Sequence, residues 1–104
     1  MHSSELFRLE GKNALVTGSA QGLGQEIALT LAQNGCSLIL GDMVYPEETS
    51  KRIAEIGSRS ISVKADISNE EDVKKMVEKA ISEYKKVDIL VNNAGVSQMS
   101  YTPS

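Results

Sequence analysis

The chain has 104 residues, of which 11 are basic and 14 acidic, for a formal net charge of −3. Hydrophobic residues make up 40% and aromatic residues 4%, which fits one globular domain and excludes a disordered chain. The mild acidity and the lack of tryptophan argue against nucleic-acid binding, which typically uses a basic stripe and aromatic stacking platforms.

The composition also argues against membrane insertion, metal binding and secretion. The longest apolar runs have three residues, as in 38–40, whereas a membrane helix needs about 20. One cysteine, Cys36, and one histidine can form neither an intrachain disulfide nor a metal cluster. Residues 1–5 lack the basic and apolar regions of a signal peptide. We therefore expect a cytoplasmic protein without a metal.

The first half of the chain predicts a strand, a helix, a second strand and a second helix. Residues 14–17 and 37–40 are short segments that each contain three consecutive apolar residues, typical of buried strands. Gly35 stands where a helix ends in a left-handed residue, and Pro46 is placed at the first position of the next helix. The apolar positions of the first helix are Leu23, Ile27, Ala28, Leu31 and Ala32. Those of the second are Ile53, Ala54 and Ile56.

The second half repeats the pattern. Residues 60–65 alternate in polarity, which predicts a third strand. Ser68 begins a Ser-x-x-Glu capping box, which predicts the start of a third helix. The helical spacing that follows comprises Val73, Met76, Val77, Ala80, Ile81 and Tyr84. Residues 87–91 predict a fourth strand, and about 97–104 form a polar tail.

Strands that alternate with helices indicate right-handed βαβ units and a parallel sheet. The order β-α-β-α-β-α-β is the first half of a doubly wound α/β fold plus the strand that crosses back. We expect the strand order 3-2-1-4, with helices on both faces. Ligands of such sheets bind at the carboxyl ends of the strands, here between the first and fourth strands.

A glycine-rich segment lies directly between the first strand and the first helix. It consists of Gly18, Ser19, Ala20, Gln21, Gly22, Leu23 and Gly24. Glycine lets backbone N–H groups approach a pyrophosphate, and the helix N-terminus adds partial positive charge. The spacing is Gly-x-x-x-Gly-x-Gly, and the Gly-Lys-Ser/Thr ending of a nucleotide-triphosphatase loop is absent. The alternative is a glycine-rich turn without a ligand.

An acidic residue, Asp42, ends the second strand 18 residues after Gly24. Its carboxylate can accept hydrogen bonds from both hydroxyls of an adenosine ribose and would repel a 2′-phosphate. Neither Gln21 nor the following Met43 offers a positive charge to such a phosphate. The pattern favours NAD over NADP, and the alternative is that Asp42 is a solvated loop carboxylate.

Several linked motifs resemble the short-chain dehydrogenase/reductase family. They are Thr17-Gly18-x-x-x-Gly22-x-Gly24, Asp42, Asp66-Ile67 and Asn92-Asn93-Ala94-Gly95, in this order and spacing. The lead-in at 9–12 and the run at 87–91 also match, so the resemblance extends from about Phe7 to Val96. The lead-in and closing turns resemble the branch that acts on sugar acids and polyols.

The resemblance implies a Rossmann-type domain that binds NAD and an activity that transfers hydride between nicotinamide and a carbonyl or alcohol substrate. It implies that Asp66 and Ile67 lie along the adenine. It also implies that Asn93, Ala94 and Gly95 run beside the cofactor's ribose and stabilise the central sheet. Thr17 would tie the glycine-rich turn to the fourth strand.

The family's catalytic residues are not found in this sequence. Members usually have roughly 250 residues in two halves, and their Tyr-x-x-x-Lys pair and catalytic Ser and Asn come from the second half. Four residues after Tyr45 is Thr49 and after Tyr84 is Asp88, whereas the pair of Tyr101 would need residue 105. We therefore expect residues 1–104 to form a single partial dinucleotide-binding domain that binds NAD but has no catalytic residue.

Two further expectations and two alternatives follow from this reading. A small-molecule substrate would bind only in a full-length parent, and the chain would self-associate through the apolar edge of the strand at 87–91. One alternative is a non-catalytic NAD-binding or sensor module. The other is a methyltransferase-like Rossmann domain, against which the Asn92-Asn93-Ala94-Gly95 run and the glycine spacing argue.

Overall fold

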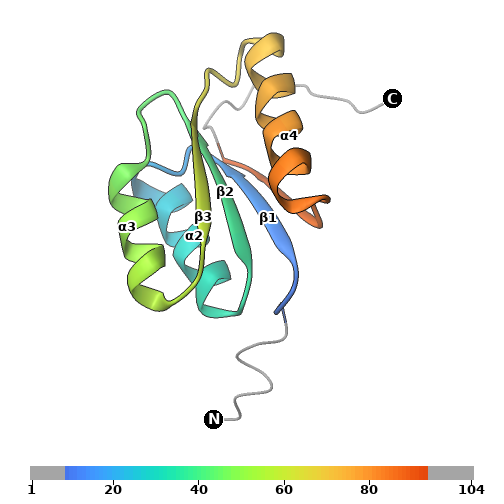
Figure 1. The fold of residues 1–104 in the computed structure, drawn as a ribbon. Coiled ribbons are helices and arrows are strands. Elements are labelled where there is room, and N and C mark those ends of the chain that lie inside the picture. The colour runs from blue at the N-terminus through green and yellow to red at the C-terminus, as the bar shows by residue number, and fades with distance from the viewer. Residues whose placement is uncertain (1–8, 94–104) are drawn as a thin grey trace.

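The computed structural model describes residues 9–93, in which strands and helices alternate (Figure 1). The strands are β1 (Asn13–Thr17), β2 (Ser37–Asp42), β3 (Ser60–Lys64) and β4 (Ile89–Asn92). The helices are α2 (Gly22–Gln33), α3 (Glu47–Ile56) and α4 (Glu70–Tyr84). All the predicted elements are confirmed, with ends that differ by one or two residues. The predicted tail at 97–104, with Ala94 and Gly95, lies outside the described residues.

The strands form one parallel sheet in the predicted order β3-β2-β1-β4. β1 lies in the centre and pairs with both β2 and β4. Its last residue, Thr17, stands opposite Gly41 of β2 and Asn92 of β4. The carboxyl ends of three strands therefore meet at one edge of the sheet.

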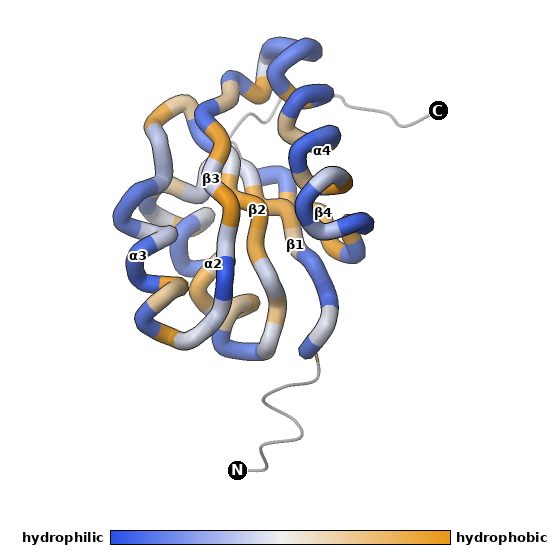
Figure 2. The backbone as a smooth tube through the Cα atoms, viewed as in Figure 1, coloured by the Kyte–Doolittle hydropathy of each residue, from blue (hydrophilic) through white to orange (hydrophobic). Residues whose placement is uncertain are grey.

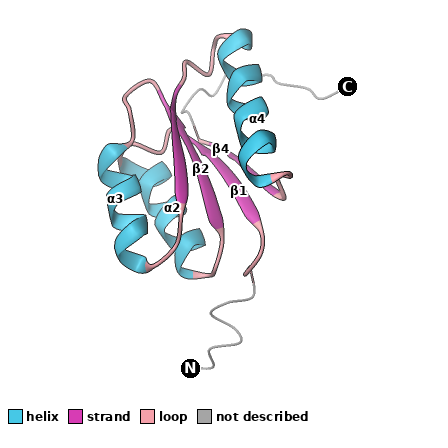
Figure 3. Cartoon of the chain, in the orientation of Figure 1, coloured by secondary structure: helices cyan, strands magenta, loops and turns pink. Residues whose placement is uncertain are grey.

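Helices cover both faces of the sheet, as predicted, with α2 and α3 on one face and α4 on the other (Figure 3). Alternate residues of the inner strands face opposite cores, because side chains of a strand point to its two faces in turn. Val16 and Leu40 pack with α2 and α3, whereas Leu15 and Ile39 pack against α4. Figure 2 shows hydrophobic residues along the central strands and hydrophilic ones along much of α3 and α4.

The buried faces of the helices are narrower than the sequence pattern predicted. Leu23 was expected in the core but is 67% exposed, and Leu29 is buried instead. Gly24 lies against Gly18, and the buried face of α2 continues from it through Ala28, Leu29 and Ala32. On α4 the buried residues are Met76, Ala80 and Tyr84, and Val77 and Ile81 remain largely exposed.

The predicted capping box of α4 is wrong. The cap is Asn69, whose side-chain oxygen accepts from the N–H of Asp72 at 3.1 Å. Ser68 lies one residue before this cap, and its hydroxyl donates to Asp66 at 2.6 Å. At α3, Pro46 is the residue before the helix and not its first member.

The start of β1 is tied to the loop before β4 through Asn13. Its N–H donates to the carboxylate of Asp88 at 2.8 Å, and the N–H of Asp88 donates back to the Asn13 carbonyl at 2.8 Å. The Asn13 side-chain amide also donates to the carbonyl of Lys86 at 3.1 Å. The hydrogen bond from Asn13 lowers the pKa of the Asp88 carboxyl below its ordinary value. These contacts hold β4 in register beside β1.

We predict that Met76 is the main contact of α4 with the centre of the sheet. It is 1% exposed and lies directly against Gly41, where an added Cβ would overlap its sulfur. Met76→Ala should lower the free energy of unfolding by about 2–5 kcal/mol through the cavity it leaves. Met76→Leu, which keeps most of the volume, should cost less than about 1.5 kcal/mol. Urea denaturation of the chain measures both, and equal losses would contradict this packing.

Candidate cofactor-binding site

The predicted site residues of the described chain gather at the carboxyl edge of the sheet. β1 ends at Thr17, and the glycine-rich turn leads into α2 at Gly22. Asp42 ends β2 and pairs in register with Lys64, two residues before Asp66. β4 ends at Asn92, beside Thr17. These residues therefore lie together at the carboxyl edge, where β1 and β4 end side by side.

The glycines of the turn meet different geometric demands. Gly18 and Gly22 have φ of +66° and +64°, in the left-handed region that other residues rarely adopt. Gly24 lies against the backbone of Gly18. An added Cβ there would overlap the Gly18 carbonyl oxygen and lie 2.8 Å from Nδ2 of Asn93. The start of α2 therefore packs directly on the turn and on the end of β4, and only glycine fits.

The N-terminus of α2 carries donors suited to an anion. The first N–H groups of a helix have no partner within the helix. Gln21, which precedes α2, makes no capping hydrogen bond with its side chain, and the first turn has no acidic residue. A Cβ built on Gly22 would meet nothing within 4 Å, so the backbone is open on that side. The helix dipole and these donors together favour a bound phosphate.

Ser19 and Ala20 are the residues of the turn whose polar groups bond to the protein. Ser19 is fully buried, and both its N–H and its hydroxyl donate to the carbonyl of Gly41 at 3.3 Å. The N–H of Ala20 donates to Asp42 Oδ2 at 2.9 Å. The Ser19 carbonyl accepts a hydrogen bond at 2.6 Å from Thr49 of α3. These bonds attach the turn to β2 and α3.

Asp42 is held in place by two backbone donors. Besides Ala20, the N–H of Val44 donates to its other carboxylate oxygen at 3.1 Å. A carboxylate oxygen can accept more than one hydrogen bond, so both oxygens keep capacity for the hydroxyls of a ribose. The carboxylate is thus an oriented, half-buried acceptor at the rim of the turn.

Thr17 joins the end of β1 to the end of β4, as the resemblance implied. Its hydroxyl oxygen accepts from the N–H of Asn93 at 2.8 Å, and the hydroxyl donates to Asn92 Oδ1 at 3.0 Å. Thr17 itself is 3% exposed. Asn93 is thereby fixed beside Gly24. Ala94 and Gly95, which were predicted to continue this contact, are outside the described residues.

Asp66, Ile67 and Met43 border the same edge. The hydroxyl and the backbone N–H of Ser68 both donate to Asp66, and these bonds hold the pKa of the Asp66 carboxyl below its ordinary value. Ile67 packs partly against the core under α4. Met43 is 61% exposed, just after Asp42.

Two supporting residues were missed by the sequence reasoning, Thr49 and Gln25. Thr49 is fully buried in α3, and the side-chain amide of Gln25 donates to its hydroxyl at 2.9 Å. The signal that could have found Thr49 is its spacing, because it lies four residues before Ile53 on the buried side of α3. A buried hydroxyl needs a partner, and the carbonyls of the turn supply it.

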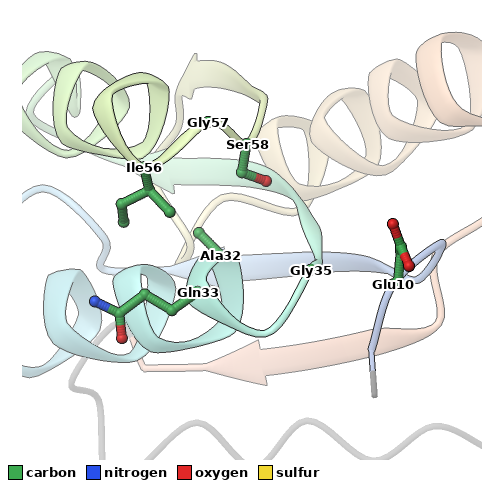
Figure 4. A pocket seen from close by; sticks show the side chains of 7 residues that line it. All are labelled: Glu10, Ala32, Gln33, Gly35, Ile56, Gly57 and Ser58. Carbon is green, nitrogen blue, oxygen red and sulfur yellow. The ribbon is translucent and has the colours of Figure 1, made fainter. Parts of the chain in front are cut away.

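A separate hollow of about 300 Å³ lies at the other end of the molecule, where α2 and α3 end (Figure 4). Its lining comprises Glu10, Ala32, Gln33, Gly35, Ile56, Gly57 and Ser58. None of the predicted site residues is among them.

Within residues 9–93, no three or more His, Cys, Asp or Glu side chains are grouped to hold a metal ion. No helix of this part of the chain is long and apolar enough to cross a membrane.

Comparison with known proteins shows the family. Residues 12–103 match the family model for short chain dehydrogenase. The chain belongs to the short-chain dehydrogenase family.

Individual relatives agree with this assignment. The chain is 47% identical over 90 residues to 2-dehydro-3-deoxy-D-gluconate 5-dehydrogenase of Dickeya dadantii, covering 86% of this chain and 36% of the relative. A crystal structure of hydroxysteroid dehydrogenase from Escherichia coli matches with a TM-score of 0.84 and 38% identity, over 89% of this chain and 40% of that one. A crystal structure of carveol dehydrogenase from Mycobacterium avium, in complex with NAD, matches with a TM-score of 0.80 and 29% identity, over 86% of this chain and 37% of that one. The chain thus spans little more than a third of these relatives.

We predict that the hydrogen bonds to Asp66 make stability depend on pH. A carboxyl whose pKa is lowered by folding stabilises the folded state above its unfolded pKa, about 3.9, and that contribution is lost as the pH falls through the folded pKa. Asp66→Asn should therefore be less stable than the parent chain at pH 7, and the difference should shrink below about pH 4. Ser68→Ala, which removes one donor of the two, should show a smaller pH-dependent difference. Urea denaturation across this range measures it, and a pH-independent difference would contradict the assignment.

Proposed function

We propose that this chain binds NAD at the carboxyl edge of its sheet, as the cofactor-binding part of an oxidoreductase. The proposed reaction is hydride transfer between nicotinamide and a carbonyl or alcohol substrate. The observation that carries the proposal is the juxtaposition of the uncapped N-terminus of α2 with the oriented carboxylate of Asp42. One edge thus offers donors for a pyrophosphate and an acceptor for a ribose.

Each predicted residue has a place in this proposal. The N–H groups at Gln21–Gly24 would hold the pyrophosphate, and Gly18 provides the turn that lets it approach. Asp42 would accept from the adenosine ribose. The adenine would lie between Met43 and the Asp66-Ile67 pair. Asn93, followed by Ala94 and Gly95, would run beside the cofactor's ribose. Ser19 and Ala20 attach the turn to β2 and α3 through their hydrogen bonds.

The charge of Asp42 supports NAD over NADP. Its hydrogen bonds to Ala20 and Val44 keep the carboxylate at the rim, so a 2′-phosphate would meet a fixed negative charge. Such like-charge contacts cost several kcal/mol, roughly, when both charges are desolvated. Bound NAD would supply the hydride acceptor, and the residues described here bind and orient it.

We predict that Asp42→Ala raises NADPH affinity relative to NADH. The loss of the bond to Ala20 should weaken both cofactors, because the turn loses a support. The measured quantity is therefore the ratio of the two dissociation constants, from fluorescence titration. Asp42→Asn, which removes the charge at nearly constant size, should shift the ratio in the same direction. An unchanged ratio in both variants would contradict the role of the charge, and a parent chain that binds neither cofactor would contradict the proposed function.

A second candidate is a non-catalytic NAD-binding or sensor module. It is favoured by Tyr45 and Tyr84, which are followed four residues later by Thr49 and Asp88 and not by lysine. Reading the coding sequence past Ser104 separates the two candidates. A Tyr-x-x-x-Lys pair in the same frame supports the oxidoreductase, and a stop without it supports the module.

We propose a sugar acid or polyol as the substrate class of the oxidoreductase. The support is the 47% identity to a relative named 2-dehydro-3-deoxy-D-gluconate 5-dehydrogenase. We also propose a cytoplasmic location, which the composition with a single, buried cysteine favours.

We further propose that the chain of 104 residues self-associates through β4, which forms an edge of the described sheet. Leu90 on this strand is 62% exposed, and unpaired edges with apolar side chains promote association. Leu90→Lys should raise the monomer fraction in sedimentation velocity. Ile56→Lys, at a site 39% exposed on α3, is the matched control and should leave it unchanged. A monomeric parent chain at high concentration would contradict the proposal.

A further inference from the structure

Thr49 places a hydroxyl in the interface between α3 and the glycine-rich turn. The residue is fully buried, and a buried hydroxyl without partners is costly. Its Oγ1 donates to the carbonyl of Ser19 at 2.6 Å and lies 3.4 Å from that of Ala20. The same oxygen accepts from Nε2 of Gln25 at 2.9 Å. The hydroxyl thus uses both its donor and an acceptor site.

The direction of these hydrogen bonds is set at the surface by Arg52. A guanidinium can only donate, so its Nη1, 3.2 Å from Gln25 Oε1, fixes which end of the amide is the oxygen. The amide nitrogen then faces Thr49 and also donates to the carbonyl of Ala20 at 3.3 Å. Because Thr49 accepts from Gln25, its hydrogen is directed to Ser19.

These contacts hold one side of the turn, and β2 holds the other. The N–H groups of Ser19 and Ala20 bond to Gly41 and Asp42, whereas their carbonyls bond to Thr49 and Gln25. The peptide unit between Ser19 and Ala20 is therefore held at both its carbonyl and its N–H, and the units before and after it are each held at one group. Since Ala20 is followed directly by Gln21 and the start of α2, their orientation sets the direction of the first N–H groups of that helix.

We propose that Thr49, oriented by Gln25, is a positioning residue that sets the affinity of the site for the pyrophosphate of the cofactor. The inference rests on the proposed function. Thr49 does not touch the cofactor, because it is fully buried beneath the turn. It acts by keeping the N–H groups at Gln21–Gly24 aligned before the ligand arrives, which removes the cost of ordering them on binding.

The test compares two substitutions at Thr49 with a matched one elsewhere. Thr49→Val keeps the shape and removes the hydroxyl, and Thr49→Ser keeps the hydroxyl. Thr30→Val makes the same change at an exposed position of α2. Thr49→Val should raise the NADH dissociation constant about tenfold, equivalent to about 1.4 kcal/mol. The NADH dissociation constants of Thr49→Ser and Thr30→Val, measured by fluorescence titration, should stay close to that of the parent chain.

A second readout separates positioning from general destabilisation. Adenosine lacks the pyrophosphate, so its binding, measured by NMR titration, should be unchanged in Thr49→Val, whereas ADP binding should weaken with NADH binding. Circular dichroism checks that each variant is folded. Gln25→Leu, which removes the amide from a half-buried position, serves if Thr49→Val does not fold, and it should weaken NADH binding in the same direction.

The outcomes are distinct. If the parent chain binds no NADH, the proposed function is wrong. If the parent chain binds NADH and folded Thr49→Val binds it equally well, the inference is overturned while the proposed function stands. Equal losses in Thr49→Val and Thr49→Ser, or an equal loss of adenosine binding, would also overturn it. If only Gln25→Leu folds, unchanged NADH binding in that variant overturns it.

Discussion

The close approach of Gly24 to the backbone of Gly18 is the constraint on which the site depends. No side chain fits between them, and Nδ2 of Asn93 would lie 2.8 Å from a Cβ at that position. The contact brings the positive end of α2 to the point where β1 and β4 end. It places a helix dipole and unpaired N–H groups at the carboxyl edge, where phosphate binding is favoured. A larger residue would push α2 away from both strands.

Around this contact, the polar groups of the turn are divided between two neighbours. On β2, the carbonyl of Gly41 and the carboxylate of Asp42 accept from the N–H groups of Ser19 and Ala20. The carbonyls of these two residues accept from Thr49 of α3 and from the side chain of Gln25. Asp42 has two roles in this arrangement. It supports the turn through Ala20, and it presents a negative charge at the rim. Cofactor preference and the shape of the turn are therefore coupled, so exchanging Asp42 changes both.

Much of the fold follows from local patterns in the sequence. The alternation of apolar runs with helical spacing predicted every element, and the pattern of a doubly wound fold predicted the order β3-β2-β1-β4. Because parallel strands share a carboxyl edge, the glycine-rich turn, Asp42 and Asn93 could also be placed together before the structure was known.

The errors concern contacts that the spacing of apolar and capping residues does not show. Leu23 fits the helical stripe, but the approach of α2 at Gly24 leaves it exposed. Ser68 fits a capping box, but the helix begins one residue later and its cap is Asn69. Thr49 looks like an ordinary polar residue, and its role depends on the carbonyl of Ser19, 30 residues away in sequence. Spacing along one element does not reveal such partners.

The most direct test is an NMR titration of the chain with NAD, followed through the backbone amide resonances. The proposed site predicts the largest shifts at Gln21–Gly24, with further shifts at Asp42, Asp66 and Asn93. Gly35 and Gly57, which line the hollow at the opposite end of the molecule, should not change. Shifts centred on Gly35 and Gly57, or no shifts at saturating NAD, would contradict the assignment of the carboxyl edge as the cofactor site.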